Sequence, residues 1–223
     1  MASSSSTSGG GKLTELQRSV LGAFFEREGA YFLTGGAALV GFHLGHRTTK
    51  DLDLFTHDAE AFERGIPTLR DVARALGLTV EIRQDAPGFK RVVLTSADDA
   101  LVVDLVLDET RPARDRVHRD AVTLDSMAEI LANKLTTLVS RSEERDLVDV
   151  MFLERSGLTV EDALPRALEK DGGCTPAQLA WLLSQIRIPD GASLPGDVEA
   201  LELREYLSDL VRRLRRAAMP PSS

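Results

Sequence analysis

Hydrophobic and polar residues alternate most clearly between residues 50 and 107. From about Lys50 to Thr56, Leu52 and Leu54 alternate with polar neighbours, the period-two pattern of a strand with one buried face. A short apolar strand is expected before it, at residues 31–34. Further strands are expected at residues 78–83, 90–95 and 101–107, and the last two flank Ala97-Asp98-Asp99, which predicts a hairpin.

Helical periodicity, with apolar residues three and four positions apart, marks most of the remaining chain. It predicts helices at residues 13–29 and 37–44, and one or two helices between residues 58 and 77, interrupted near Pro67. After Asp125 the chain is expected to be helical to its end, at residues 126–140, 143–154, 160–170, 176–186 and 199–217. Ser140-x-x-Glu143 fits a capping box between the first two of these. The pattern therefore predicts an α+β fold with a flexible tail at residues 1–12, an α/β domain at 13–125 and a helical domain at 126–223.

Composition narrows the class of protein. The 223 residues are 43% hydrophobic and 28% charged, which is ordinary for a globular protein. The single cysteine, Cys174, excludes an internal disulfide framework and a cysteine-based zinc site. The net charge of −8 argues against a general nucleic-acid binder. No apolar run reaches the ~18 residues of a membrane span, and the serine-rich start lacks the apolar core of a secretory signal, so we expect a cytoplasmic protein without a membrane partner.

The candidate chemistry centres on Asp51 and Asp53. Because side chains alternate along a strand, both carboxylates point to one face, where they repel each other unless a cation lies between them. Oxygen ligands of this kind suit Mg²⁺, or Mn²⁺ in its place, together with substrate phosphates. Upstream, Gly35-Gly36 offers backbone that a phosphate can approach closely. The alternative is an ordinary half-exposed strand with polar residues facing water.

Two further features remain open between a functional and a structural role. Asp104 lies inside an almost wholly apolar run, so it either reaches a cation or lies where the strand meets solvent. The stretch at residues 111–119 is either a solvated loop or an electropositive lip for RNA phosphates, formed by Arg111, Arg114, Arg116 and Arg119. A second cluster, Arg212, Arg213, Arg215 and Arg216, is equally explained by the dipole of a helix C-terminus.

The glycine turn followed by an Asp-x-Asp strand resembles the nucleotidyltransferase fold of the DNA polymerase β type. Over residues 31–153 the chain is similar to the AbiEii/AbiGii-type nucleotidyltransferase toxins of type IV toxin–antitoxin systems, including the mycobacterial MenT group. The residues that carry this resemblance are Gly35, Gly36, Gly45, Arg47, Thr49, Asp51, Asp53, Lys134, Leu135, Arg141, Asp146 and Asp149.

The resemblance implies an enzyme that transfers NMP from an NTP to an RNA acceptor, the 3′ end of tRNA, and so blocks translation. It implies a mixed sheet in a polymerase-β-like domain, completed by the helical domain. The implied catalytic residues are Asp51, Asp53, Lys134 and Asp149, with Asp146 and Arg141 as further candidates. The implied nucleotide-binding residues are Gly35, Gly36, Arg47, Thr49 and Lys134, and the metal ligands are Asp51, Asp53 and Asp104. A cognate antitoxin is implied as a partner, and Thr49 as the place where it could silence the enzyme by phosphorylation.

Other interpretations stay open at this point. The acceptor could be a protein side chain or a small molecule such as an aminoglycoside, or the chain could be a non-catalytic nucleotide-binding regulator. Lys134 could be a surface lysine, although its neighbours are apolar. Asp146 and Asp149 could pair with Arg141 or Arg145 on the surface instead of completing a site.

Overall fold

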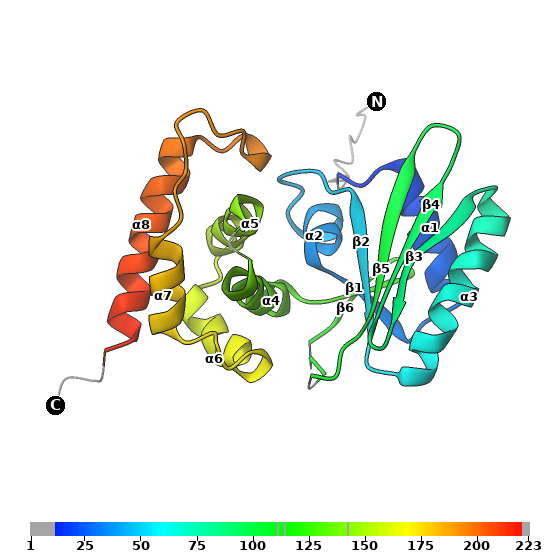
Figure 1. Ribbon diagram of the computed structural model, residues 1–223, viewed down its shortest axis with the longest axis horizontal. Coiled ribbons are helices and arrows are strands. Elements are labelled where there is room, and N and C mark those ends of the chain that lie inside the picture. The colour runs from blue at the N-terminus through cyan, green and yellow to red at the C-terminus, as the bar shows by residue number, and fades with distance from the viewer. Residues whose placement is uncertain (1–11, 111, 114, 142, 220–223) are drawn as a thin grey trace, which may run out of the picture.

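A mixed β-sheet separates two groups of helices in the computed structural model (Figure 1). The structure describes residues 12–110, 112–113, 115–141 and 143–219, so the predicted tail lies outside it except for Lys12. The seven strands of the described sheet lie in the order β3-β4-β5-β2-β1-β7-β6. They are β1 (Tyr31–Thr34), β2 (Asp51–Thr56), β3 (Thr79–Ala86), β4 (Phe89–Thr95), β5 (Ala100–Leu107), β6 (Val117–Arg119) and β7 (Val122–Leu124).

The sheet is mixed because β2 pairs in parallel with β5 and antiparallel with β1. Leu52 and Leu54 on β2 are fully buried, as the alternation predicts, and Asp51 and Asp53 face the other way. The helices α1 (Glu15–Phe25) and α3 (Ala59–Leu76) cover the face with the leucines. The aspartate face is turned toward α4. With a mixed sheet and helices on both of its sides, the prediction of an α+β protein with a mixed sheet is confirmed.

In the described part of the chain, five helices follow the sheet (Figure 1). They are α4 (Met127–Ser140), α5 (Glu144–Arg155), α6 (Val160–Lys170), α7 (Pro176–Ser184) and α8 (Ala200–Ala217), with a 3₁₀ turn at Pro195–Asp197 before the last. Their positions agree with the predicted helical segments within two residues. Helix α4 lies nearest to the sheet, and α7 and α8 lie on the side of α4 and α5 that faces away from it (Figure 1). The division of the chain into two domains at residue 125 stays a prediction. Among the described helices, none is long and apolar enough to cross a bilayer.

Three local predictions were wrong. The segment after Pro67 does not start a new helix, because α3 runs through the proline, held by the buried stripe of Phe62, Ile66 and Leu69 and by Asp58 at its N-cap. The predicted capping box is absent, since Ser140 ends α4 and its hydroxyl donates to the carbonyl of Thr137. The helix expected at 37–44 begins earlier, as α2 (Gly35–Ala38), and continues as a π-helical turn, Leu39–His43.

Candidate active site

Four polar side chains form a row across neighbouring strands of the aspartate face. In the sheet register, Arg91 on β4 lies opposite Asp104 on β5, Asp104 opposite Asp53 on β2, and Asp53 opposite Thr34 on β1. In-register residues of a sheet share a face and lie ~4.8 Å apart between strands. The row therefore brings the third predicted carboxylate, Asp104, next to Asp53, while Asp51 lies two residues along β2.

The predicted glycine turn lies directly against this row. Gly35 has a φ of +62°, and a Cβ atom there would be 2.3 Å from Oδ2 of Asp53. A Cβ atom on Gly36 would be 3.0 Å from Nη2 of Arg47 and 3.1 Å from Oγ1 of Thr49. Only glycine at position 35 allows both this backbone conformation and the close approach to the carboxylate. The turn predicted to bind phosphate and the strand predicted to bind metal thus form one surface.

A cavity of about 360 Å³ opens between β2 and α4 at this surface. Nearly all the predicted catalytic, nucleotide-binding and metal-binding residues line it: Gly35, Gly36, Arg47, Thr49, Asp51, Asp53, Asp104, Lys134, Arg141 and Asp146. We refer to this cavity as the β2–α4 groove. Eight further residues line the groove that the sequence did not predict for the site: Thr34, Phe55, Arg91, Ile130, Asn133, Thr136, Thr137 and Arg145.

The aspartates create a negative centre in the groove. Burial, together with the charges of Asp51 and Asp104, raises the pKa of Asp53 to about 7, against the opposing charges of Lys134 and Arg141. A divalent cation between the carboxylates would relieve this repulsion, so Asp51 and Asp53 fit a Mg²⁺ ion that takes its other oxygens from water and phosphate. Thr49 donates to Oδ1 of Asp51 (2.7 Å) and fixes the orientation of that carboxylate.

Asp104 is held away from such a centre by Arg91. Nε and Nη2 of Arg91 donate to Oδ1 and Oδ2 of Asp104, each at 2.7 Å. In the described part of the chain, no three histidine, cysteine, aspartate or glutamate side chains converge as a ready metal cluster. Asp104 is nevertheless buried, so the alternative in which it faces water at the sheet surface does not apply.

Asp149 is fully buried at the junction of α5 with the segment before β2, and it does not line the groove. Its Oδ1 accepts from Nε2 of His46 (2.8 Å) and Nε of Arg47 (2.7 Å), and its Oδ2 accepts from Nη2 of Arg47 (2.7 Å) and Nζ of Lys134 (2.7 Å). Although burial alone would raise it, the pKa of Asp149 is held far below its usual range by Arg47, His46 and Lys134. Asp149 therefore orients Arg47 and Lys134, two of the cations that line the groove.

Lys134 joins the two helices that the sequence predicts to meet here. Its ammonium also donates to Oδ1 of Asp146 (2.7 Å), whose Oδ2 lies 3.4 Å from Nε of Arg141. Lys134 and Asp146 are both buried, so neither the surface-lysine alternative nor a surface pairing of Asp146 describes them. Burial opposes the charge on Lys134, but Asp149 and Asp146 outweigh it and raise the pKa of Lys134, which stays charged.

His46 was not predicted, and it connects the groove to the C-terminal helices. Its ring stacks on Phe152 of α5 with 4.4 Å between centroids. A Cβ atom on Gly196, in the turn before α8, would lie 3.1 Å from the carbonyl oxygen of His46. The only sequence signal for this role is its position beside Arg47.

The predicted RNA-binding loop is placed only in part. Arg111 and Arg114 lie outside the described residues. Arg116 turns inward, with its guanidinium 3.4 Å from the ring centroid of Phe32 and 2.8 Å from Nε2 of His57. Arg119 is exposed on β6 at the sheet edge, three strands from β2. Neither Arg116 nor Arg119 lines the β2–α4 groove.

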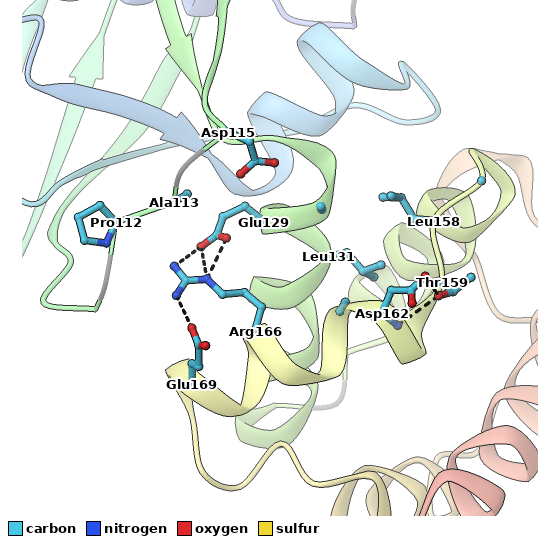
Figure 2. Close-up of a pocket in the computed structure, with 13 residues that line it drawn as sticks. Pro112, Ala113, Asp115, Glu129, Leu131, Leu158, Thr159, Asp162, Arg166 and Glu169 are labelled. Atoms are coloured by element: carbon cyan, nitrogen blue, oxygen red, sulfur yellow. Dashed lines mark hydrogen bonds and ion pairs between the residues drawn. The ribbon is translucent and has the colours of Figure 1, made fainter.

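A second cavity of about 510 Å³ lies between Pro112, Ala113 and Asp115 on one side and the helices α4 and α6 on the other (Figure 2). Its polar side chains are mostly acidic, and its arginine, Arg166, binds both Glu129 (2.9 Å) and Glu169 (3.0 Å). An acidic lining repels phosphates. The β2–α4 groove, with glycines, paired aspartates and several cations, is therefore the better candidate for phosphate chemistry.

Asp125, a buried residue beside the groove, makes stability depend on pH. Burial and the charge of Glu129 raise the pKa of Asp125 to about 6, against hydrogen bonding with Thr34. The folded protein therefore holds this proton more tightly than the unfolded chain, whose aspartate pKa is about 3.9. The stability that this tighter proton binding contributes is fully present below about pH 4, and it is lost as the pH rises through about 6.

We expect an Asp125→Asn variant, which keeps the shape of the side chain, to escape this loss. Above pH 6 it should be more stable than the wild type by at most about 2–3 kcal/mol, and near pH 4 the two should be equal. Urea unfolding at several pH values from 4 to 8 measures the difference. Parallel pH profiles for the two proteins would contradict the prediction.

Comparison with known proteins adds a family and two related folds. The family model "Nucleotidyl transferase AbiEii toxin, Type IV TA system" matches residues 20–222. The crystal structure of JHP933 from Helicobacter pylori is 19% identical, with a TM-score of 0.57 and 91% of each chain covered. An H. pylori protein assigned as a nucleotidyltransferase is 18% identical, with a TM-score of 0.57, covering 93% of this chain and 100% of its own. No curated protein matches.

Proposed function

We propose that this chain, which belongs to the AbiEii family of nucleotidyl transferase toxins of type IV toxin–antitoxin systems, transfers NMP from an NTP to the 3′ end of tRNA and so blocks translation. One observation carries the proposal. Gly35, Asp51, Asp53 and the cations Arg47 and Lys134 all face the same groove. This combination suits a triphosphate, because phosphoryl transfer depends on positioning and on neutralising charge. Family membership also implies a cognate antitoxin as a partner.

The transfer makes one bond and breaks another. The acceptor hydroxyl oxygen bonds to the α-phosphorus, the bond from that phosphorus to the oxygen bridging to the β-phosphate breaks, and pyrophosphate leaves. Arg47 and Lys134, oriented by Asp149, would hold the triphosphate against Gly35 and Gly36. Asp51 and Asp53 would hold Mg²⁺, which when bound supplies positive charge at the phosphates. A groove carboxylate would accept the proton of the attacking hydroxyl.

A polymerase-β-like arrangement is supported by the order of these parts. The glycine turn follows β1, the aspartates lie on the antiparallel neighbour β2, and Asp104 lies on β5 beside it. The helices α4 and α5 then contribute Lys134 and, behind it, Asp149. In this proposal, the predicted helical domain completes the site by supplying its cations and their orientation.

Incubation of the purified protein with each labelled NTP and Mg²⁺ tests the function. Separate reactions contain total tRNA, a protein extract or a small-molecule acceptor such as an aminoglycoside. The proposal expects the label at the 3′ end of tRNA, and tRNA without that end should not be labelled. Label on a protein or a small molecule would identify a different acceptor for the same nucleotidyl transfer. NTP binding without any transfer would favour a non-catalytic regulator.

RNA should reach the groove through arginines at its mouth. Arg145 is half-exposed on α5 and lines the groove, whereas Arg119 lies at the far sheet edge. We expect Arg145→Gln to weaken tRNA binding and to reduce the log–log salt slope by about one. Binding of the same tRNA at several salt concentrations measures this. An unchanged slope in Arg145→Gln with a reduced slope in Arg119→Gln would move the docking site to the predicted loop.

A further inference from the structure

Arg91 and Asp104 form a pair whose two members differ sharply in exposure. The Asp104 side chain is 9% exposed, whereas the Arg91 side chain is 47% exposed and lines the groove. Two parallel hydrogen bonds join the guanidinium to both carboxylate oxygens. A long, half-exposed arginine can leave such a pair by rotating into solvent, whereas a buried aspartate on a central strand cannot follow it.

This pair prevents Asp104 from acting with its neighbours. Asp104 lies in register with Asp53, yet both of its oxygens are engaged by Arg91. A cation bound beside Asp104 would also meet the positive charge of the guanidinium. The pair is therefore incompatible with Asp104 as a full metal ligand, although its place in the row suits that role.

We propose that Arg91 is a substrate-binding residue. A substrate phosphate replaces Asp104 as the partner of the Arg91 guanidinium, and the freed carboxylate of Asp104 then joins Asp53 as a ligand of the divalent cation. This inference rests on the proposed function, because it assigns phosphate-bearing substrates to the groove. Phosphate suits Arg91 for the same reason as carboxylate, since both accept a two-point contact from a guanidinium. Substrate arrival would thus complete the metal site, and the site would stay incomplete in its absence.

Mn²⁺ binding without substrate tests the first half of the proposal. We expect Arg91→Met to bind Mn²⁺ about 10- to 100-fold more tightly than the wild type, the range that charge-assisted hydrogen bonds contribute. Arg91→Lys, which keeps the charge but loses the fork, should lie between them. Calorimetry or electron paramagnetic resonance gives the affinities, and thermal melting confirms that each variant is folded.

Arg145→Met is the matched control. Arg145 has the same 47% exposure and lines the same groove, but it pairs with Glu143 instead of Asp104. Any gain that it shows measures the general effect of removing one positive charge. Adding Asp104→Asn to Arg91→Met should remove the specific gain. Equal gains in Arg91→Met and Arg145→Met, or a gain that survives Asp104→Asn, would overturn the proposal.

A separate measurement determines whether the phosphate that binds Arg91 belongs to the NTP or to the RNA acceptor. The Nε–H signal of Arg91 in ¹H–¹⁵N spectra, identified by its loss in Arg91→Met, reports the state of the pair. With EDTA present, an RNA oligonucleotide that shifts this signal would identify the acceptor as the source. An NTP that shifts it would identify the donor, and a signal unmoved by either would overturn release by phosphate.

These outcomes separate the inference from the proposed function. A gain of Mn²⁺ affinity in Arg91→Met, with no NMP transfer by the wild type to any acceptor, would reject the function and keep the Arg91–Asp104 mechanism. Transfer by the wild type with no gain of affinity in Arg91→Met would reject the mechanism alone.

Discussion

Replacing Asp53 with asparagine is expected to abolish NMP transfer and, in metal-free protein, to raise the melting temperature. Asp53 lies half-buried beside Asp51 and Asp104, and its burial and their charges outweigh the opposing charges of Lys134 and Arg141 and raise its pKa to about 7. Removing one charge relieves the repulsion between them. At the same time it removes a ligand of the cation that transfer needs, which is worth several kcal/mol, or about a thousandfold in rate.

Above pH 7, where Asp53 would be ionised, the stability gain should be at most about 4 kcal/mol, each kcal/mol being worth roughly 2–4 °C for a chain of this size. Thermal melting in EDTA measures it, and addition of Mg²⁺ should then stabilise the wild type more than Asp53→Asn. Asp85→Asn is the control, because Asp85 is 58% exposed on β3 and does not line the groove. It should change neither transfer nor the response to Mg²⁺. Wild-type rates in Asp53→Asn, or transfer by the wild type in EDTA, would contradict the metal site.

The parts of the fold that local sequence determines were predictable. The alternation of aspartate and leucine at residues 51–54 depends only on the strand period, so it gave the correct faces of β2. The turn at Ala97-Asp98-Asp99 joins β4 and β5 as expected. Pairing outward from that turn places Arg91 opposite Asp104, so this contact could have been found from the predicted hairpin.

Other features of the fold depend on contacts between distant residues, which local sequence patterns do not predict. A proline inside a helix costs stability because it lacks an N–H group and so removes a backbone hydrogen bond. In α3, burial of one face of the helix outweighs the cost of Pro67. The contact of Asp149 with His46 and Arg47 joins residues more than one hundred positions apart. The resemblance supplied Arg47 and Asp149 as site residues, but only the fold shows that Asp149 lies behind the cations instead of in the groove.

The position of Asp149 leads to a second strong prediction, that Asp149→Ala loses both activity and stability. The substitution leaves Arg47 and Lys134 buried without their shared counter-charge. Breaking a buried ion pair in this way costs about 3–5 kcal/mol. Urea unfolding measures the loss, and NTP binding should weaken because Arg47 loses the carboxylate that orients it and Lys134 keeps only Asp146.

Lys134→Met separates the structural role of this network from its role in binding. On its own it should weaken NTP binding and slow transfer together, because it removes a cation that faces the triphosphate. If the melting temperature alone changed and the kinetics did not, Lys134 would be a structural residue.

In the Asp149→Ala background, Lys134→Met should cost less stability than it does in the wild type, because the contact between Lys134 and Asp149 is already lost and only the pair with Asp146 remains to be broken. The double-mutant cycle should therefore show a coupling free energy of about 1–3 kcal/mol between the two positions. Transfer should stay absent in the double variant, since neither the cation nor the residue that orients it is present. Additive losses of stability would show that Asp149 and Lys134 act independently, and Asp149 would then not be the residue that orients the groove.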